Sequence, residues 1–336
     1  MEAQSTRESS AQVGATATAL WYVGPQRADV RTETLPRRGE GELLVETRWS
    51  ALSRGTERLV FAGLVGPDHS ERMRAPMQDG EFPFPVKYGY CAVGRVVEGP
   101  QRFLGRHVFV LHPHQDRFIV QADDVLPIPE AVPPRRATLA ANMETALNAL
   151  WDSGAGAGDR IVVVGAGLVG LLITYLAAQL PGAEVTAVDP DPARGAIAGS
   201  FGAHFAACTQ AVSEADVVFH TSASSEGLCA ALSCCATEAS LVEVSWYGDK
   251  SVTVGLGGSF HAKRLRLISS QVGAVPAARA PRWPHKRRLA KALDLLADPR
   301  LDALITEDVA FADLPGALAR ILGDDPQGVA TVVRYA

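Results

Sequence analysis

Residues 161–189, IVVVGAGLVGLLITYLAAQLPGAEVTAVD, constrain the fold more than any other segment of the chain. The apolar, β-branched run at 161–164 predicts a short strand buried on both faces of a parallel sheet. A glycine-rich turn and a long apolar helix pattern follow, and Pro181 and Gly182 end that helix. The run at 184–188 predicts a second strand. Strand, turn, helix and strand together indicate a parallel α/β unit.

The glycines of this turn have the spacing G-x-G-x-x-G, at Gly165, Gly167 and Gly170. In such a unit the first glycine allows a tight turn, and the second lets the backbone approach a pyrophosphate. The third lets helix and strand pack closely. The first helical residues, Leu168 and Val169, would offer unpaired N–H groups at the positive end of the helix dipole. The pattern therefore predicts a dinucleotide site.

Asp189 ends the second strand, where an acidic residue follows the turn at the distance such sites require. Its carboxylate could accept hydrogen bonds from an adenosine ribose diol and would repel a 2′-phosphate, so we expect NAD rather than NADP. A membrane span is the alternative, because 161–180 is almost entirely apolar. The three glycines, Pro181 and the strand-like Val/Ile content argue against a span.

Composition narrows the class of protein. A chain of 336 residues suits two domains, and a net charge of −5 gives no sign of nucleic-acid binding. The five cysteines include no C-x-x-C pair, so neither a zinc ribbon nor a redox motif is indicated. No basic segment leads into an apolar core at the N-terminus, and 1–14 is polar and expected to be disordered. We expect a cytoplasmic protein without nucleic-acid or membrane partners.

The chain divides by its pattern of elements. Short strands separated by Gly and Pro clusters predict an all-β, partly closed barrel over 17–130. A helix is expected within 137–154, and α/β alternation continues after Asp189. We expect a β-rich domain at 15–140 and 272–336, and a nucleotide-binding domain at 141–271.

This order, with GDRIVVVGAGLVG and VDPDPARGAIAGSFGA, resembles the medium-chain dehydrogenase/reductase superfamily of alcohol-dehydrogenase-like enzymes. The resemblance implies an α/β protein with a GroES-like β-rich catalytic domain and a Rossmann doubly wound parallel-sheet domain. It also implies a nicotinamide cofactor that meets a small-molecule substrate between the domains, and a homodimer.

Zinc-binding members of that superfamily hold a catalytic zinc ion at positions that match Arg54, Tyr90 and Ala141 here. Zinc requires three protein ligands of N, S or O type, and these residues do not supply them. The four-cysteine structural zinc lobe is also missing, since 95–130 contains no cysteine. The resemblance therefore implies a zinc-independent branch, nearest to bacteriochlorophyllide a dehydrogenase-like members, which share a Gly-Thr-Glu and a Gly-Tyr segment.

Without zinc, hydrogen-bond donors must polarise the substrate oxygen. Thr56 falls where zinc members keep a proton-relaying hydroxyl, and Tyr90 could act as an acid or base if its pKa is depressed. Glu57 could orient a neighbour, or face solvent. Arg54 or Lys87 could bind an anionic group or lower the pKa of Tyr90.

Further cofactor contacts are expected at five positions, each with a structural alternative. Arg194 could approach the adenosine or be a solvated helix residue. Thr145 could approach the nicotinamide or bond its own helix backbone. Ser222, Ser245 and Ser269 follow strands, and ligands bind at that edge of doubly wound sheets, although serine is also common in turns.

Possible substrate contacts are more scattered. His112 and His114, two apart in an expected strand, would point to one face as a metal pair or a polar wall. Glu144 and Asn148 are one turn apart on the inter-domain helix, and Gln271 is either a cleft residue or a loop amide. A basic stretch could clamp a phosphorylated substrate or mark a subunit contact, but a solvated helix start is the simpler interpretation; it comprises Arg279, Arg282, Lys286, Arg287 and Arg288, with Trp283.

The leading hypothesis is a zinc-independent, NAD-dependent oxidoreductase that transfers hydride between nicotinamide and a carbonyl or secondary alcohol. Three alternatives stay open. They are an enoyl or quinone reductase, a redox-neutral epimerase or lyase that retains NAD, and a non-catalytic nucleotide-sensing scaffold.

Overall fold

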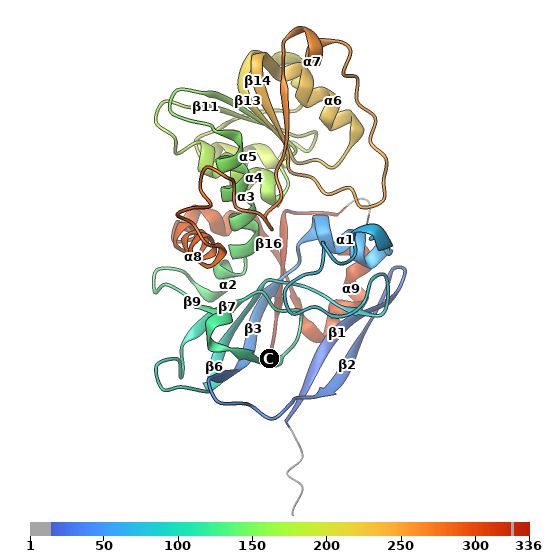
Figure 1. Cartoon of the computed structure of the whole chain (residues 1–336), viewed down its shortest axis with the longest axis vertical. Coiled ribbons are helices and arrows are strands. Elements are labelled where there is room, and N and C mark those ends of the chain that lie inside the picture. Colours follow the sequence, from blue (N-terminus) through green and yellow to red (C-terminus); the bar gives the residue numbers. More distant parts are fainter. Residues whose placement is uncertain (1–14, 324–325) are drawn as a thin grey trace, which may run out of the picture.

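The computed structural model describes residues 15–323 and 326–336, so the expected disorder of 1–14 lies outside the described residues. The chain forms two halves stacked along the long axis, a parallel-sheet half and a β-rich half (Figure 1). This is the α/β fold that the sequence predicts, with an antiparallel β-rich part beside a six-stranded parallel sheet.

The parallel sheet has the strand order β12-β11-β10-β13-β14-β15. The first strand in the sequence, β10, lies at the centre of this sheet. The next two strands, β11 and β12, lie on one side of β10, and β13, β14 and β15 lie on the other. The carboxyl ends of β10 and its two neighbours therefore meet at a topological switch point, where doubly wound sheets bind ligands. The strands are β10 (Arg160–Val164), β11 (Glu184–Val188), β12 (His204–Ala206), β13 (Ala215–His220), β14 (Cys235–Glu243) and β15 (Arg266–Ser269).

Helices cover this sheet. The first after the glycine turn, α4 (Leu168–Ala177), is apolar on all sides and buried from Gly170 onward, because it packs between the sheet and α3. Such a helix is a core element. The other helices of this half are α3 (Ala140–Ser153), α5 (Ala193–Ser200), α6 (Ser225–Cys234) and α7 (Ser259–Ala262).

The β-rich half contains two sheets. The larger has the order β16-β17-β3-β6-β7-β9, with β8 paired to β3, and the smaller has the order β2-β1-β5-β4. The strands are β1 (Thr16–Gly24), β2 (Arg27–Thr34), β3 (Glu42–Ala51), β4 (Asp79–Gly80), β5 (Val86–Lys87), β6 (Ala92–Glu98), β7 (His107–Val110), β8 (Arg117–Gln121), β9 (Val125–Pro127), β16 (Ile305–Ala310) and β17 (Ala330–Arg334).

The all-β prediction for 17–130 is wrong at one helix, α1 (Arg54–Ala62). The side chains of its apolar run, Leu59, Val60 and Phe61, are buried, and Gly63 ends it in the left-handed conformation (φ 73°) that favours glycine. The sequence contains both signals, but the strands on either side obscure them. This helix begins three residues after the end of β3 and carries two of the predicted catalytic residues, Thr56 and Glu57.

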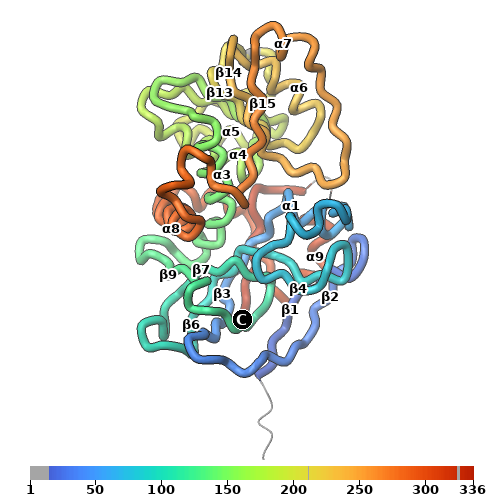
Figure 2. The backbone as a smooth tube through the Cα atoms, in the orientation of Figure 1, coloured from blue at the N-terminus to red at the C-terminus, as the bar shows by residue number. Residues whose placement is uncertain are grey.

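The C-terminal segment returns to the β-rich half. β17 pairs with β3 in antiparallel register, Val333 opposite Ser50, so the C-terminal strand joins the larger sheet of the β-rich half (Figure 2). Before this return, α8 (His285–Leu295) packs on α3. The remaining helices are α2 (Pro134–Ala137) and α9 (Leu314–Ile321), with short 3₁₀ turns at Pro67–His69, Ala122–Asp124, Thr209–Ala211, Pro299–Leu304 and Phe311–Asp313.

Candidate functional site

The glycine turn after β10 has the geometry that its spacing predicts. Gly165 has φ +102°, and a Cβ there would lie 2.8 Å from the backbone N of Ser222. A Cβ on Gly170 would lie 1.9 Å from the carbonyl oxygen of Gly165, so only glycine allows α4 to pack this closely. At Gly167, by contrast, no heavy atom of the described chain lies within 4 Å of where a Cβ would be. The turn therefore leaves open space beside its middle glycine, as a pyrophosphate requires.

Asp189 follows β11 and lies beside this turn. Its carboxylate accepts hydrogen bonds from the backbone N–H of Ala166 at 2.7 Å and of Asp191 at 2.9 Å. Two backbone donors leave a carboxylate with further lone pairs, which can accept from ribose hydroxyls. Leu168 and Val169, half-buried, form the first turn of α4 with Gly167 as its N-cap.

Arg194 and Thr145 make contacts within the protein. The Arg194 guanidinium pairs with Asp191 (Nε–Oδ2 3.1 Å) and donates from Nη2 to the carbonyl of Gly328 at 2.8 Å, which ties α5 to the C-terminal segment. The Thr145 hydroxyl donates to the carbonyl of Ala141 at 3.0 Å, the backbone bond that we gave as the alternative to a nicotinamide contact.

The three predicted serines lie at or just beyond the carboxyl ends of neighbouring strands. Ser222 follows β13 and Ser245 follows β14, and the Ser245 hydroxyl accepts from the backbone N–H of Ala223 at 3.1 Å. Ser269 ends β15 and is exposed. All three thus lie on the edge of the sheet that carries the glycine turn.

Tyr90 precedes β6 and lies beside the hydroxyl groups of Ser53 and Thr56, at the start of α1. Burial raises the pKa of Tyr90 well above its ordinary value, Cys91 adds to the rise, and the two hydroxyl groups only partly oppose it. This is the reverse of the depressed pKa considered from the sequence. Tyr90 is therefore a neutral phenol and can donate a hydrogen bond, but it does not act as a phenolate near neutral pH.

Glu57 does not face solvent. It is fully buried, and its carboxylate accepts from Tyr22 Oη at 2.7 Å and from the backbone N–H of Ser53 at 2.8 Å. His114 Nε2 lies 3.0 Å from the same carboxylate, and its Nδ1 lies 2.8 Å from Ser50 Oγ. Glu57 and His114 thus form a buried pair inside the β-rich half, which holds the start of α1 in place.

Arg54, at a zinc-ligand position of zinc members, points to the C-terminal segment. Its guanidinium donates to the carbonyls of Gln327 at 2.6 Å and Gly328 at 2.8 Å, and to Thr331 Oγ1 at 3.1 Å. Burial lowers the pKa of Arg54. Together with Arg194, which reaches the same Gly328 carbonyl, it joins the two halves of the molecule.

The predicted histidine pair is not on a strand, because β7 ends at Val110. His112 stacks on Phe118 with ring centroids 3.8 Å apart, and burial lowers its pKa to about 3. Lys87 pairs with Glu33 at 2.7 Å and with Asp79 at 3.5 Å. Contacts within the protein therefore explain the positions of the His112 and Lys87 side chains, and neither position requires a bound substrate.

Glu144 and Asn148 face a third residue, Arg288. Its guanidinium donates to Glu144 Oε1 at 2.9 Å, to Asn148 Oδ1, and to the carbonyl of Val272. The prediction that Arg288 is a solvated helix residue is wrong: it is only 1% exposed, because these acceptors surround it. Gln271 is exposed, and its amide oxygen accepts from the backbone N–H of Gly273 at 2.6 Å, as a loop amide.

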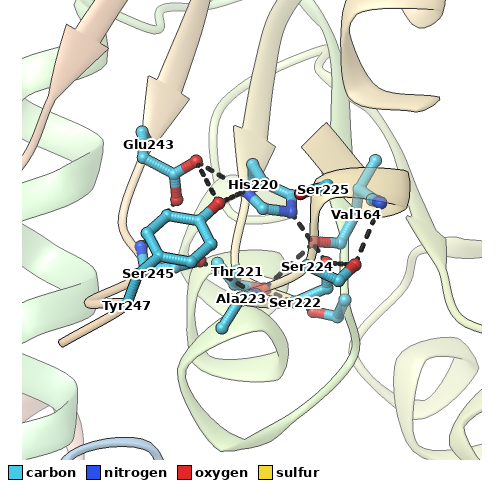
Figure 3. Close-up of polar contacts among 12 residues, drawn as sticks. Val164, His220, Thr221, Ser222, Ala223, Ser224, Ser225, Glu243, Ser245 and Tyr247 are labelled. Atoms are coloured by element: carbon cyan, nitrogen blue, oxygen red, sulfur yellow. Dashed lines mark hydrogen bonds and ion pairs between the residues drawn. The ribbon is translucent and has the colours of Figure 1, made fainter. Parts of the chain in front are cut away.

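Sequence reasoning missed a polar cluster at the ends of β13 and β14 (Figure 3). His220 ends β13 and is fully buried, with Nδ1 2.7 Å from Glu243 Oε2 and Nε2 2.7 Å from Ser222 Oγ. Tyr247 donates to Glu243 Oε2 at 3.0 Å. The sequence signal for this cluster is a polar residue at the last position of each of two adjacent strands, His220 in β13 and Glu243 in β14. Trp246, in the loop after β14, packs against the cluster of the β-rich half that includes Tyr90.

Two further observations concern metal and membrane. Within residues 15–323 and 326–336, no group of three or more His, Cys, Asp or Glu side chains is arranged to hold a metal ion. No helix in the described part of the chain is both long and apolar enough to cross a membrane.

Comparisons with known proteins agree with this architecture. No family model matches the sequence. D-guloside 3-dehydrogenase of Escherichia coli K12 is 24% identical over 319 residues, covering 85% of this chain and 90% of that protein.

Two solved structures show the same fold. L-idonate 5-dehydrogenase of E. coli K-12 superimposes with a TM-score of 0.77 at 15% identity, over 96% of this chain and 99% of that one. An alcohol dehydrogenase of E. coli CFT073 in complex with NADH has a TM-score of 0.73 at 16% identity, over 96% and 100%. The protein therefore shares the fold of the medium-chain dehydrogenases and reductases.

Proposed function

We propose that the protein is an NAD-dependent oxidoreductase that transfers hydride between nicotinamide and a carbonyl or secondary-alcohol carbon of a small molecule. The observation that carries this proposal is the glycine turn, where Gly165 and Gly170 admit no side chain and Gly167 faces open space beside Asp189. These residues fit a dinucleotide, with the pyrophosphate at the N-terminus of α4. Bound nicotinamide would supply the hydride acceptor or donor.

The preference for NAD over NADP rests on Asp189. A 2′-phosphate beside this carboxylate would meet like charge, while a ribose diol could donate to it. Arg194, the cation nearest in sequence, already pairs with Asp191 and the Gly328 carbonyl, and so is poorly placed to offset that repulsion.

We further propose that no catalytic zinc takes part. The three positions that match the zinc ligands of the superfamily carry a guanidinium, a phenol and a methyl group, at Arg54, Tyr90 and Ala141. Arg54 is engaged by backbone carbonyls of the C-terminal segment. This set does not fit zinc, whose protein ligands are thiolates, imidazoles and carboxylates.

Thr56 and Tyr90 then act on the substrate oxygen. Their hydroxyl groups lie close together, and the neutral Tyr90 phenol can donate to a carbonyl oxygen. Thr56 is partly exposed, so its hydroxyl group could relay the proton that the substrate oxygen loses to solvent, or relay one from solvent to that oxygen. Glu57 helps to fix the position of both side chains, because its carboxylate accepts a hydrogen bond from the backbone N–H of Ser53 at the start of α1.

The substrate class that we propose is a sugar, sugar derivative or polyol with a secondary alcohol. D-guloside 3-dehydrogenase and L-idonate 5-dehydrogenase act, by their names, on such molecules. We also propose a homodimer, because β15 ends the parallel sheet and exposes Leu267 (43%) on its edge strand.

The test is NAD⁺ reduction at 340 nm by purified protein with a panel of glycosides, aldonates and polyols, in the presence and absence of a chelator. We expect chelator-resistant NADH formation with at least one sugar-type substrate. Loss of activity with the chelator and recovery with zinc would contradict the metal-free mechanism. NADH binding without turnover across alcohols, enones and epimerisation substrates would favour the nucleotide-sensing alternative.

A further inference from the structure

The cluster of His220, Glu243 and Ser222 forms a continuous hydrogen-bonded chain at the edge of the parallel sheet. Glu243 Oε2 and Ser222 Oγ each lie 2.7 Å from opposite nitrogens of the His220 ring. His220 is fully buried, whereas Ser222 is exposed beside the glycine turn (Figure 3). A buried imidazole that connects a carboxylate to one exposed hydroxyl can fix the direction of that hydroxyl.

The proton positions in this chain follow from Glu243. Burial opposes its ionisation, but the hydrogen bond and charge of His220 and the backbone N–H of Ser245 keep the pKa of Glu243 below its usual range. An ionised carboxylate only accepts, so His220 Nδ1 carries the proton that it shares with Glu243. His220 Nε2 lies 2.7 Å from Ser222 Oγ, and this contact uses either the proton or one lone pair of the Ser222 hydroxyl group.

Ser222 Oγ also contacts Ser224 Oγ at 3.1 Å. When one of these two contacts uses the hydroxyl proton and the other uses a lone pair, the second lone pair of Ser222 is left for a ligand hydroxyl. Gly227 shows how closely this arrangement is packed, since a Cβ there would lie 2.0 Å from Ser222 Oγ and 2.9 Å from His220 Nε2. A side chain at Gly227 would displace the chain of hydrogen bonds.

The sheet order locates the ligand group. Asp189 follows β11, on one side of β10, and the glycine turn follows β10 itself. Ser222 follows β13, on the opposite side of β10, with its backbone N 2.8 Å from a Cβ on Gly165. If Asp189 holds the adenosine ribose, Ser222 lies toward the other half of the dinucleotide.

We propose that Ser222 accepts a hydrogen bond from a hydroxyl group of the nicotinamide-side ribose, and that His220 and Glu243 are positioning residues that orient it. This inference rests on the proposed NAD-dependent function and adds a second ribose contact to that of Asp189. It assigns binding roles to a buried histidine and a half-buried glutamate that have no part in the hydride-transfer step.

The test compares ligands with and without the second ribose. The full-length protein is titrated calorimetrically with NADH, ADP-ribose and ADP. We expect Ser222→Ala to weaken NADH and ADP-ribose about three- to tenfold, the loss of one hydrogen bond, and to leave ADP unchanged. Ser225→Ala is the matched control, because its hydroxyl accepts instead from the backbone N–H of Thr253 at 3.3 Å.

A double-mutant cycle separates positioning from general structure. In His220→Asn the amide can still reach Glu243 but not Ser222, and in His220→Gln it can reach Ser222. We expect His220→Asn to weaken NADH as much as Ser222→Ala does, the double variant to be no weaker than Ser222→Ala, and His220→Gln to recover part of the loss.

Additive losses in the cycle, an unchanged NADH affinity in Ser222→Ala, or an equal loss for ADP would overturn the proposal. In each of these cases wild-type protein still binds NADH, so the proposed function stands. If wild-type protein binds none of the three ligands, the proposed function and this inference fail together.

Discussion

A Cβ on Gly170 would lie 1.9 Å from the carbonyl oxygen of Gly165. The first and third glycines of the turn are thus in direct backbone contact, and a side chain at position 170 would force the start of α4 away from the turn. The middle glycine, Gly167, has an ordinary φ of −73° and open space beside it. The fold therefore requires glycine at positions 165 and 170, whereas Gly167 leaves the space that the proposed dinucleotide would occupy.

Alanine substitutions should separate these two requirements. Gly170→Ala should destabilise the protein by about 1–3 kcal/mol, because the added methyl group overpacks the helix start. Gly167→Ala should unfold at the wild-type temperature but bind NADH at least about tenfold more weakly, since its methyl group enters the space expected for the pyrophosphate. Thermal melts and NADH titrations measure both effects, with Gly199→Ala as the control in open space on α5. Equal loss of stability in both variants would contradict this distinction.

Asp189→Asn should shift the cofactor preference toward NADPH. The asparagine oxygen can still accept from Ala166, but the negative charge that repels a 2′-phosphate is gone. We expect the ratio of the NADPH and NADH dissociation constants to fall by about tenfold, corresponding to roughly 1.4 kcal/mol. An unchanged ratio would show that Asp189 does not contact the adenosine ribose.

Tyr90→Phe and Thr56→Val should each lower kcat, by about 10²-fold or more, and leave NADH affinity unchanged. Burial raises the pKa of Tyr90, so its phenol stays protonated throughout the neutral range. Its ionisation therefore adds no rise in rate between pH 6 and 9, and wild type and Tyr90→Phe should have pH profiles of the same shape. Tyr88→Phe, a neighbouring ring with its centroid 5.9 Å away, is the control and should retain kcat. Full activity in Tyr90→Phe would remove Tyr90 from the mechanism.

Arg288→Ala should be strongly destabilising, by about 3–5 kcal/mol, because it leaves Glu144 buried without its partner. Arg287→Ala, one residue away, removes only an exposed guanidinium that lies 4.0 Å from the centroid of the Trp283 ring, and should cost about 1 kcal/mol or less. Urea unfolding followed by circular dichroism measures both. Similar losses for the two arginines would contradict the difference in burial.

His112 should make the protein sensitive to acid. Burial lowers its folded-state pKa to about 3, below the value of about 6.5 expected when unfolded. The unfolded chain therefore binds this proton first, and stability is lost as pH falls from about 6.5 toward 3, by up to about 1.4 kcal/mol per unit. His112→Phe, which retains a ring against Phe118, should remove this part of the pH dependence. An identical acid profile in the variant would contradict the prediction.

The dinucleotide turn could be predicted because its signal is local. Gly165, Gly167 and Gly170 act through backbone conformation within one strand–turn–helix unit, and their spacing alone determines which positions lack side chains. The elements on either side are equally local, so β10 and β11 appear where the residue pattern predicts them. The helix α4 begins where predicted but ends at Ala177, before the expected stop at Pro181. The return of β17 to β3 has no local signal, since it pairs opposite ends of the chain.

Charged side chains were harder to interpret, because their partners are distant in sequence. Arg288 contacts Glu144 across 144 positions, and Arg54 contacts Gly328 across 274. A motif identifies neither pair. The link between His220 and Glu243 was accessible in principle, because parallel neighbouring strands bring their last residues to the same edge. The hydroxyl groups of Ser222 and Ser245 are the more familiar ligand signal at this edge, and they do not indicate the contact between histidine and glutamate.

A dinucleotide site that prefers NAD is the central property proposed for this protein. Titration of purified, chelator-treated protein with NADH and NADPH, followed by nicotinamide fluorescence, measures this preference directly. We expect one NADH bound per chain, without added metal, and an affinity for NADPH at least about tenfold weaker. Failure to bind NADH, or equal or tighter binding of NADPH, would contradict it.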